Sequence, residues 1–177
     1  MTEKEILSAI EEGNYNLAFN AIVENYSERL YWHLRNFTLN HDDTDDLVQD
    51  VYVKIWNSLS GFRGESGLFT WIWRIATNTA LNYIKKAKLR SALSLSSYSS
   101  EAGRLIDSDP WFDGDAAERN LSKAIAALPS KQRTVFCMRY YEDLSYEEIA
   151  EITGTSVGAL KTSYHIAAEK LKKYLTD

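Results

Sequence analysis

Cysteine, proline and glycine are scarce in this sequence, and each scarcity excludes a class of protein. Cys137 is the single cysteine, so the chain forms no internal disulfide, which suits a reducing cytoplasm. The three histidines are far apart and do not pair with that cysteine at zinc-ligand spacings. Two prolines and eight glycines in 177 residues leave few breaks in regular structure.

Long hydrophobic runs are missing as well. No apolar run approaches the roughly 20 residues that span a bilayer. Glu3, Lys4 and Glu5 stand where a signal peptide would have its apolar segment, so we expect a cytoplasmic protein. The sequence shows no Ser/His/Asp set, phosphate-binding loop or metal-ligand cluster. We therefore predict no enzymatic activity, no cofactor, no metal and no small-molecule substrate.

The residues that are abundant predict an all-α fold. Leu, Ala, Ile, Glu and Lys fill the long segments, with apolar residues three or four positions apart. We expect two small helical domains, 1–90 and 121–177, joined by an acidic, serine-rich linker over 91–120 without a helical period and flexible at least in part. Four apolar linker residues are candidates to dock on a neighbouring domain: Leu105, Ile106, Trp111 and Phe112.

Net charge gives a weak argument against nucleic-acid binding. The chain carries −5 overall, but the acid is concentrated in the linker. The two flanking blocks are near neutral, so either of them can still present a basic face.

The first block is predicted to contain helices over 3–12, 16–41 and 69–88, and another that begins at residues 42–44. Asp43 or Thr44 is expected to cap this last helix. Its buried face is predicted to be Leu47, Val48, Val51, Tyr52, Ile55 and Trp56. The rest of its surface is acidic: Asp45, Asp46, Gln49 and Asp50. That surface is either a solvated face near the helix N-terminus or a docking face for a basic partner.

A glycine-containing loop at 61–67 precedes an aromatic helix with a basic end. Trp71 and Trp73 are each either a core side chain or a stacking surface for an unpaired base. Cationic and amide side chains nearby suit phosphates and base edges. The candidate strand-binding residues are Arg63, Trp71, Trp73, Arg74, Asn78, Lys85 and Lys86.

The last block predicts a helix-turn-helix. A capping box of the S-x-x-E type begins at Ser145, and Gly154 ends that helix in a tight turn. A second helix runs from Val157 to Tyr174, and the second helix of such a unit typically enters the major groove of DNA. The side chains predicted to project toward DNA are Ser156, Lys161, Thr162 and His165. A generic helical hairpin is the alternative.

Cys137 is expected to be a small buried hydrophobe.

Several segments together resemble the extracytoplasmic-function sigma factors. They are DDLVQDVYVKIW at 45–56, FRGES at 62–66, FTWIWRIATN at 69–78, Leu128-Pro129, RYYEDLSYEEIA at 139–150 and SVGALKT at 156–162. The segments follow the family's order, with a linker between the two halves. They are far more specific jointly than the helix-turn-helix is alone.

The resemblance implies an all-α RNA polymerase sigma factor of group IV, which directs the polymerase to specific promoters and assists strand opening. Asp45, Asp46, Gln49 and Asp50 would dock on the basic clamp coiled coil of core RNA polymerase. The loop and the aromatic helix would capture an unstacked base of the promoter −10 element. The helix-turn-helix would bind the −35 duplex. The family also implies an anti-sigma partner, commonly a membrane protein.

One departure from the family and two alternative functions complete the sequence evidence. The family's recognition helix is usually arginine-rich, whereas here Ser163, Ile166, Ala168 and Glu169 occupy such positions. One alternative is a helix-turn-helix regulator that binds duplex DNA without acting as a sigma subunit and needs no acidic docking helix. The other is a sigma-like interaction module that binds regulators but not DNA.

Overall fold

Every regular element in the described part of the computed structural model is helical, which confirms the all-α prediction. The structure describes residues 1–93, 98–110, 112 and 114–177. The helices are α1 (Glu3–Glu11), α2 (Tyr15–Arg35), α3 (His41–Ser58), α4 (Leu68–Leu93), α5 (Tyr98–Ser108), α6 (Ala116–Ala126), α7 (Ser130–Tyr140), α8 (Tyr146–Thr153) and α9 (Val157–Thr176), with a 3-10 turn, η1 (Leu59–Gly61), after α3. Within these residues no helix is both long and apolar enough to cross a membrane.

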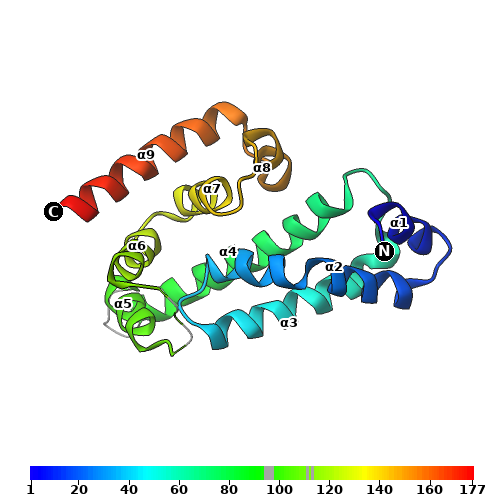
Figure 1. Ribbon diagram of the computed structural model, residues 1–177, viewed down its shortest axis with the longest axis horizontal. Coiled ribbons are helices and arrows are strands. Elements are labelled where there is room, and N and C mark those ends of the chain that lie inside the picture. Colours follow the sequence, from blue (N-terminus) through cyan, green and yellow to red (C-terminus); the bar gives the residue numbers. More distant parts are fainter. Residues whose placement is uncertain (94–97, 111, 113) are drawn as a thin grey trace.

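Helices α1 to α4 pack together as the first half of the molecule (Figure 1). The long helix α4 lies along α2 and α3, and its apolar positions recur every three or four residues on the side that faces them. Ile72, Trp73 and Ala76 are completely buried there. The 3.6-residue period therefore places one face of α4 in the core and leaves the opposite face to carry polar side chains.

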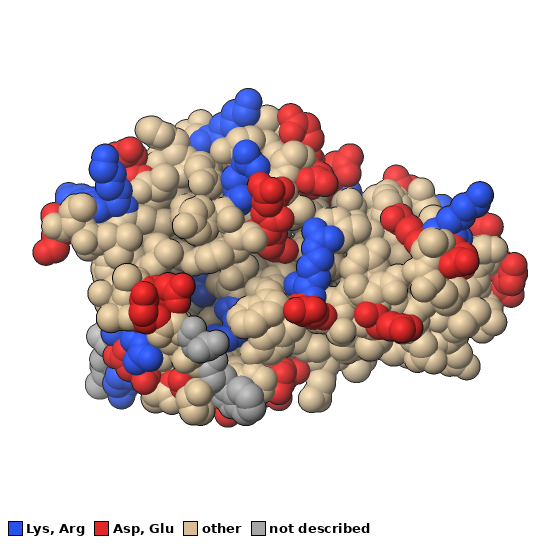
Figure 2. All heavy atoms as spheres, viewed as in Figure 1, with Lys and Arg blue, Asp and Glu red and all other residues tan. Residues whose placement is uncertain are grey.

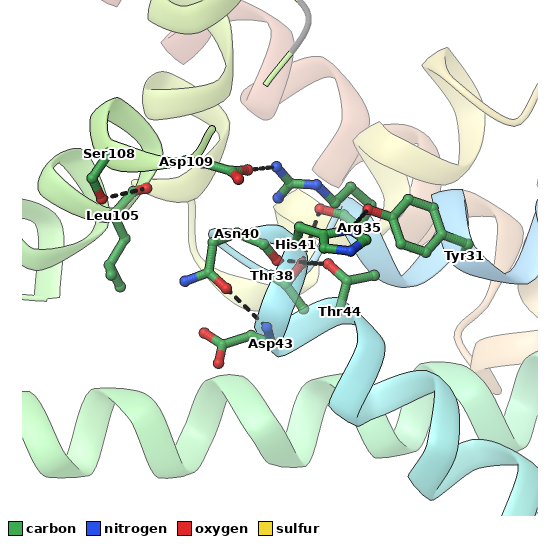
Figure 3. A network of polar contacts seen from close by, with 10 residues as sticks. All are labelled: Tyr31, Arg35, Thr38, Asn40, His41, Asp43, Thr44, Leu105, Ser108 and Asp109. Atoms are coloured by element: carbon green, nitrogen blue, oxygen red, sulfur yellow. Dashed lines mark hydrogen bonds and ion pairs between the residues drawn. The ribbon is translucent and has the colours of Figure 1, made fainter. Parts of the chain in front are cut away.

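The corner between α2 and α3 differs from the sequence prediction. Helix α2 ends at Arg35, and α3 begins at His41. Asn40 is the N-cap of α3, since its side-chain oxygen accepts a hydrogen bond from Asp43 N at 2.8 Å. Thr44 is buried instead, and its hydroxyl lies 2.6 Å from that of Thr38 and donates to Asn40 O at 2.8 Å (Figure 3). The prediction that Asp43 or Thr44 caps this helix is therefore wrong, because the Asn40 side chain accepts the hydrogen bond from the backbone N–H of the first turn.

The segment between the two halves contains a helix that its composition did not predict. Helix α5 buries Ala102 and Ile106 against Leu39 and Ala126, and Leu105 packs beside them. The docking predicted for the Leu105-Ile106 pair is thus confirmed, and the predicted lack of helix is wrong across α5. Packing against these residues stabilises α5, although its serine-rich sequence does not favour a helix by itself. The predicted docking of Trp111 and the serine-rich residues 94–97 lie outside the described residues.

Helices α6 to α9 form the second half, in which α9 packs on α6 and α7. Cys137 is completely buried in a cluster with Phe136, Ala167 and Leu171, so the prediction of a buried hydrophobe is confirmed. Burial raises the pKa of its thiol to about 12. The thiol is therefore protonated at neutral pH and is unsuited to act as a nucleophile.

The two halves meet along a broad apolar contact. Helix α8 packs on α4 near the N-terminal turns of the long helix (Figure 1), where Arg74 contacts Glu151. The core cluster of the first half continues into the second through Met138, Leu144, Ile149 and Ile152. In this conformation the molecule has one shared core that crosses the boundary between its halves.

Candidate polymerase and nucleic-acid interfaces

The acidic face of α3 is the first candidate interface. Leu47, Val51 and Ile55 hold the opposite side of the helix in the core. The structure leaves all four predicted docking residues exposed: Asp45, Asp46, Gln49 and Asp50. Positions 46, 49 and 50 are separated by three and four residues, so these side chains lie on one face of the helix.

A small polar network fixes the start of this face. The Tyr31 hydroxyl lies 2.7 Å from His41 Nδ1, and His41 Nε2 lies 3.1 Å from Asp45 Oδ2. Figure 3 shows Tyr31 reaching from α2 toward His41 at the first turn of α3. Asp45 therefore has an intramolecular partner, whereas Asp46 and Asp50 have none recorded among the described contacts.

Two apolar side chains extend the acidic face, and the sequence argument did not assign them to it. Val53 is 59% exposed and Trp56 is 44% exposed. Trp56 was expected in the core, but it lies at the surface, where its ring meets that of Phe19 edge on at 5.4 Å between centroids. The spacing from Gln49 to Val53 and on to Trp56 is four and three residues, which is the signal that places both on the acidic face.

The loop before α4 forms the second candidate interface. Gly64 takes a left-handed conformation, with φ +71°, which turns the loop beside the start of α4. A cavity of about 460 Å³ lies here, and it is lined by Leu7, residues 64–67, Arg74 and Glu151. The loop residue Arg63 is exposed, and its guanidinium donates to Ser60 O at 3.3 Å. The hollow therefore has a glycine-containing rim, one arginine and two glutamates, Glu65 and Glu151, so its lining offers both donors and acceptors to a flat polar group.

Trp71 and Trp73 occupy different environments although they are two residues apart. Trp71 is half-buried, with its ring 4.9 Å from that of Phe62. Trp73 is completely buried, with its ring 4.2 Å from Phe69 and 5.2 Å from His33. Because a helix turns by about 100° per residue, the two rings point to nearly opposite sides of α4.

The polar face of α4 carries the remaining residues predicted to bind the open strand. Arg74, Asn78, Lys85 and Lys86 are exposed, and so is Asn82, which lies one turn after Asn78. The four-residue steps from 74 to 78 to 82 and the next steps to 85 and 86 align these side chains in one stripe. Arg74 also donates from Nε to Glu151 O in α8 at 2.8 Å. One end of the stripe therefore touches the second half of the molecule.

The helix-turn-helix forms the third candidate interface, and its predicted local signals are present. Ser145 and Glu148 make a reciprocal capping box at 3.1 and 2.7 Å. Gly154 ends α8 in a left-handed conformation, with φ +73°, and its N–H donates to Ala150 O at 2.8 Å. Ser156 then caps α9 by accepting from Ala159 N at 3.2 Å. These caps fix the angle at which α9 leaves α8.

One face of α9 is buried and the other is open. Leu160, Ala167 and Leu171 hold the helix against the second half. The predicted −35 residues are all exposed: Ser156, Lys161, Thr162 and His165. The ammonium of Lys161 lies 5.8 Å from the centroid of the Tyr146 ring, so Tyr146 of α8 contacts the charged tip of this side chain. Figure 2 shows Lys and Arg interspersed with Asp and Glu over both halves of the visible surface.

Family models match both halves of the chain. "Sigma-70 region 2" matches residues 22–90, which hold the acidic face, the loop and most of α4. "Sigma-70, region 4" matches residues 118–171, which include the helix-turn-helix.

Curated relatives match over nearly the whole length. The chain is 30% identical to the ECF RNA polymerase sigma-E factor of Haemophilus influenzae, over 97% of this chain and 94% of the relative. It is 29% identical to the ECF RNA polymerase sigma factor SigW of Bacillus subtilis strain 168, over 100% and 98%.

Two solved structures share the fold. One is CnrH in complex with the cytosolic domain of CnrY, with a TM-score of 0.70 and 24% identity over 98% of this chain and 97% of that chain. The other is the sigma factor RpoE in complex with the anti-sigma factor NepR from Bartonella quintana, with a TM-score of 0.67 and 23% identity over 89% and 96%.

Proposed function

This chain belongs to the extracytoplasmic-function RNA polymerase sigma factors, and we propose that its two halves divide promoter recognition between them. As a sigma factor it directs RNA polymerase to specific promoters and assists strand opening in transcription initiation. We assign residues 1–90 to polymerase docking and the −10 element, 121–177 to the −35 element, and 91–120 to the connection. We also place it in group IV and in the cytoplasm, and assign it no catalytic step of its own.

The acidic face of α3 is our proposed docking site for core RNA polymerase. Asp46, Gln49 and Asp50 present negative charge and an amide to solvent, while Val53 and Trp56 add exposed apolar surface beside them. A basic partner such as the clamp coiled coil would be attracted by the opposite charge, which speeds its association with this face. Burial of the apolar surface would slow the dissociation of the complex. This exposed combination on one helix is the observation that carries the proposal. Asp45 adds to the same charge while it is paired with His41.

The cavity beside the loop is our proposed binding site for a flipped −10 base. Trp71 lies on the same first turns of α4 as the lining residue Arg74, and Arg63 and Arg74 supply cations for the strand. Stacking on an aromatic ring contributes about 1–3 kcal/mol per base, which is enough to offset much of the cost of unstacking. Asn78, Lys85 and Lys86 continue the path along α4. The buried Trp73 side chain anchors α4 in the core and does not face the strand.

The exposed face of α9 is our proposed −35 site. Lys161, Thr162 and His165 lie within one turn or so of each other and face solvent. Ser156 stands at the N-terminus of α9, where backbone N–H groups favour a phosphate. An A·T-rich −35 element suits a helix without arginine, since bidentate arginine contacts mainly select guanine.

An anti-sigma factor is a further proposed partner. The two structural neighbours are each bound to a second protein, and one title identifies that protein as an anti-sigma factor. We propose a partner of this kind, anchored in the membrane or not, which would cover surfaces assigned above to polymerase or promoter. A regulator that binds duplex DNA alone would leave the first half of the chain without a role.

Charge reversal on α3 tests the docking proposal. The double variant Asp46→Lys, Asp50→Lys should lose comigration with core RNA polymerase on a sizing column, because both changes place like charge against a basic partner. Glu24→Lys is the matched control, since Glu24 is an exposed acid on α2. Comigration of the double variant at the wild-type level would contradict docking through this face.

A further inference from the structure

Helix α1 lies outside residues 22–90, which match the region 2 model, yet it is fixed to the first half of the molecule. Ile6 and Ile10 are buried in the core cluster, where α1 packs on α2. Thr2 caps the helix, since its hydroxyl accepts from Glu5 N at 3.3 Å and the Glu5 carboxylate accepts from Thr2 N at 2.6 Å. The first turn of α1 therefore has a defined position in the first half.

The side chain of Glu3 reaches from this first turn to the start of α4. Glu3 Oε1 accepts a hydrogen bond at 3.1 Å from the backbone N–H of Leu68, which is the first residue of α4. The two residues are 65 positions apart in the sequence. The hydrogen bond thus connects α1 to the helix that we propose binds the open strand.

The N-cap residue of α4 has no side chain with which to cap the helix. Gly67 stands at this position, because its carbonyl accepts the first hydrogen bond of the helix from Trp71 N at 3.1 Å. The hydroxyl of the preceding residue, Ser66, donates to Gly67 O at 3.3 Å. The Glu3 carboxylate supplies the acceptor that serine or aspartate supplies at an ordinary N-cap. Its negative charge also suits the positive end of the helix dipole.

The same face of α1 forms a wall of the cavity beside the loop. Leu7 lies four residues after Glu3, so both side chains project from one face of the helix. Leu7 lines the cavity together with residues 64–67 and Arg74. The last residue of that loop segment directly precedes the N–H that Glu3 binds. One face of α1 therefore bounds the cavity and also fixes the point where the loop enters α4.

We propose that α1 is part of the −10 site, and that Glu3 is a positioning residue that holds the loop at 64–67 in the shape that accepts a flipped base. The proposal rests on the proposed binding of a −10 base in this cavity. Glu3 acts through the backbone of the loop and α4, without touching the base. A loop that is fixed before binding loses less conformational freedom when the base enters, so the base is captured more readily.

Hydrogen exchange in the full chain tests the contact itself. Glu3→Ala removes the acceptor of the Leu68 N–H, so exchange of that amide, followed by NMR, should become about fivefold faster, as for the loss of a helix cap. Glu3→Gln keeps an oxygen acceptor without the charge and should give a smaller increase. Glu11→Ala is the matched control, because Glu11 is an exposed acid at the other end of α1. Unchanged exchange in Glu3→Ala would overturn the contact, and the proposal with it.

A carboxylate supplied from a different position should restore the cap. The φ of Gly67 lies outside the left-handed region, and a Cβ placed there would meet only Glu3 Oε1, at 3.8 Å. Gly67→Asp therefore fits the backbone and places its carboxylate at the N-cap. In the Glu3→Ala background it should return exchange of the Leu68 amide to within about twofold of wild type. In the wild-type background it should give no such gain, because two carboxylates would share one helix end.

Strand opening shows whether this cap matters for the −10 base. A 2-aminopurine base in the −10 element reports opening by the polymerase complex, and the signal is normalised to binding of closed duplex. Glu3→Ala should lower opening about fivefold, and adding Gly67→Asp should restore it to within about twofold of wild type. Adding Gly61→Asp to Glu3→Ala should not restore it. Gly61 is the matched loop position, since a Cβ there would meet nothing within 4 Å.

The outcomes separate this proposal from the proposed function. If Glu3→Ala opens the promoter like wild type although its Leu68 amide exchanges faster, Glu3 only caps α4, and the positioning role is overturned while the proposed function stands. Recovery of exchange without recovery of opening in Glu3→Ala, Gly67→Asp would overturn the positioning role as well. If the wild-type complex itself opens no promoter, the proposed function fails and the positioning role fails with it.

Discussion

Trp71 and Trp73 are two residues apart on α4 but lie in different environments. We therefore expect substitution of each tryptophan to impair a different property of the protein. Trp73 is completely buried and its ring packs on Phe69 at 4.2 Å and His33 at 5.2 Å. Trp71 is half-buried, and its ring touches Phe62 at 4.9 Å. We expect Trp73→Ala to lower stability and Trp71→Ala to impair strand opening.

The expected magnitudes differ by enough to measure. Emptying the Trp73 site should lower the free energy of unfolding by about 3–5 kcal/mol, because a large core side chain is lost and a cavity remains. Trp71→Ala should lower it by about 0.5–1.5 kcal/mol, the value of one aromatic pair. The loss of a stacked base in Trp71→Ala would weaken strand opening by about 1–3 kcal/mol, which is about 5- to 150-fold.

Two assays separate the effects. Urea unfolding followed by circular dichroism gives the change in stability, and a 2-aminopurine base placed in the −10 element reports strand opening by the polymerase complex. Opening is compared with binding to closed duplex at a temperature where Trp73→Ala is folded. If both variants lose the same unfolding free energy and opening falls only with the folded fraction, then both rings are core residues. The assignment of Trp71 to a base would then be wrong.

Three further variants test the other surfaces. Val53→Ser should weaken core polymerase binding about tenfold in a titration without lowering the unfolding midpoint, because it removes apolar surface from the docking face at an exposed site and adds no charge. Lys161→Ala should reduce the slope of log K against log salt for −35 duplex binding by about 0.9, as one phosphate contact is lost, whereas Lys131→Ala should not. Gly154→Ala should cost about 1–2 kcal/mol in urea unfolding, because φ there is +73°, while Gly158→Ala should be neutral or stabilising within α9.

Each of these expectations has a clear contrary outcome. Unchanged polymerase affinity in Val53→Ser would mean that Val53 contributes no apolar contact to docking. An unchanged salt slope in Lys161→Ala would mean that this side chain touches no phosphate. Equal stability of the two glycine variants would mean that the α8–α9 turn does not require the left-handed conformation seen here.

Local signals in the sequence were sufficient for the helix-turn-helix and for the acidic face. The Ser145 capping box and the turn at Gly154 each depend on residues within one or two turns, and each is present in the structure. The exposure of Asp46 and Asp50 follows from the same periodicity. Such interactions are encoded by spacing along the chain, so they can be predicted from it.

The features that were missed depend on contacts between distant segments. Helix α5 lies in a serine-rich stretch and is held by Leu39 and Ala126, which the sequence does not mark as neighbours. Trp73 and Trp71 are equivalent in the sequence, and only the packing against Phe69 and the contact with Glu142 distinguish them. Tertiary context decides both cases, and it overrides local propensity.

The most direct test of the central claim is transcription by core RNA polymerase supplied with this protein on a library of genomic fragments. Sequencing the 5′ ends of the products identifies the start sites. The account predicts transcripts that depend on the protein, share −10 and −35 elements upstream, and disappear with Asp46→Lys, Asp50→Lys. If products do not exceed those of core enzyme alone, or start sites share no upstream elements, the claim that this chain acts as a sigma factor is contradicted.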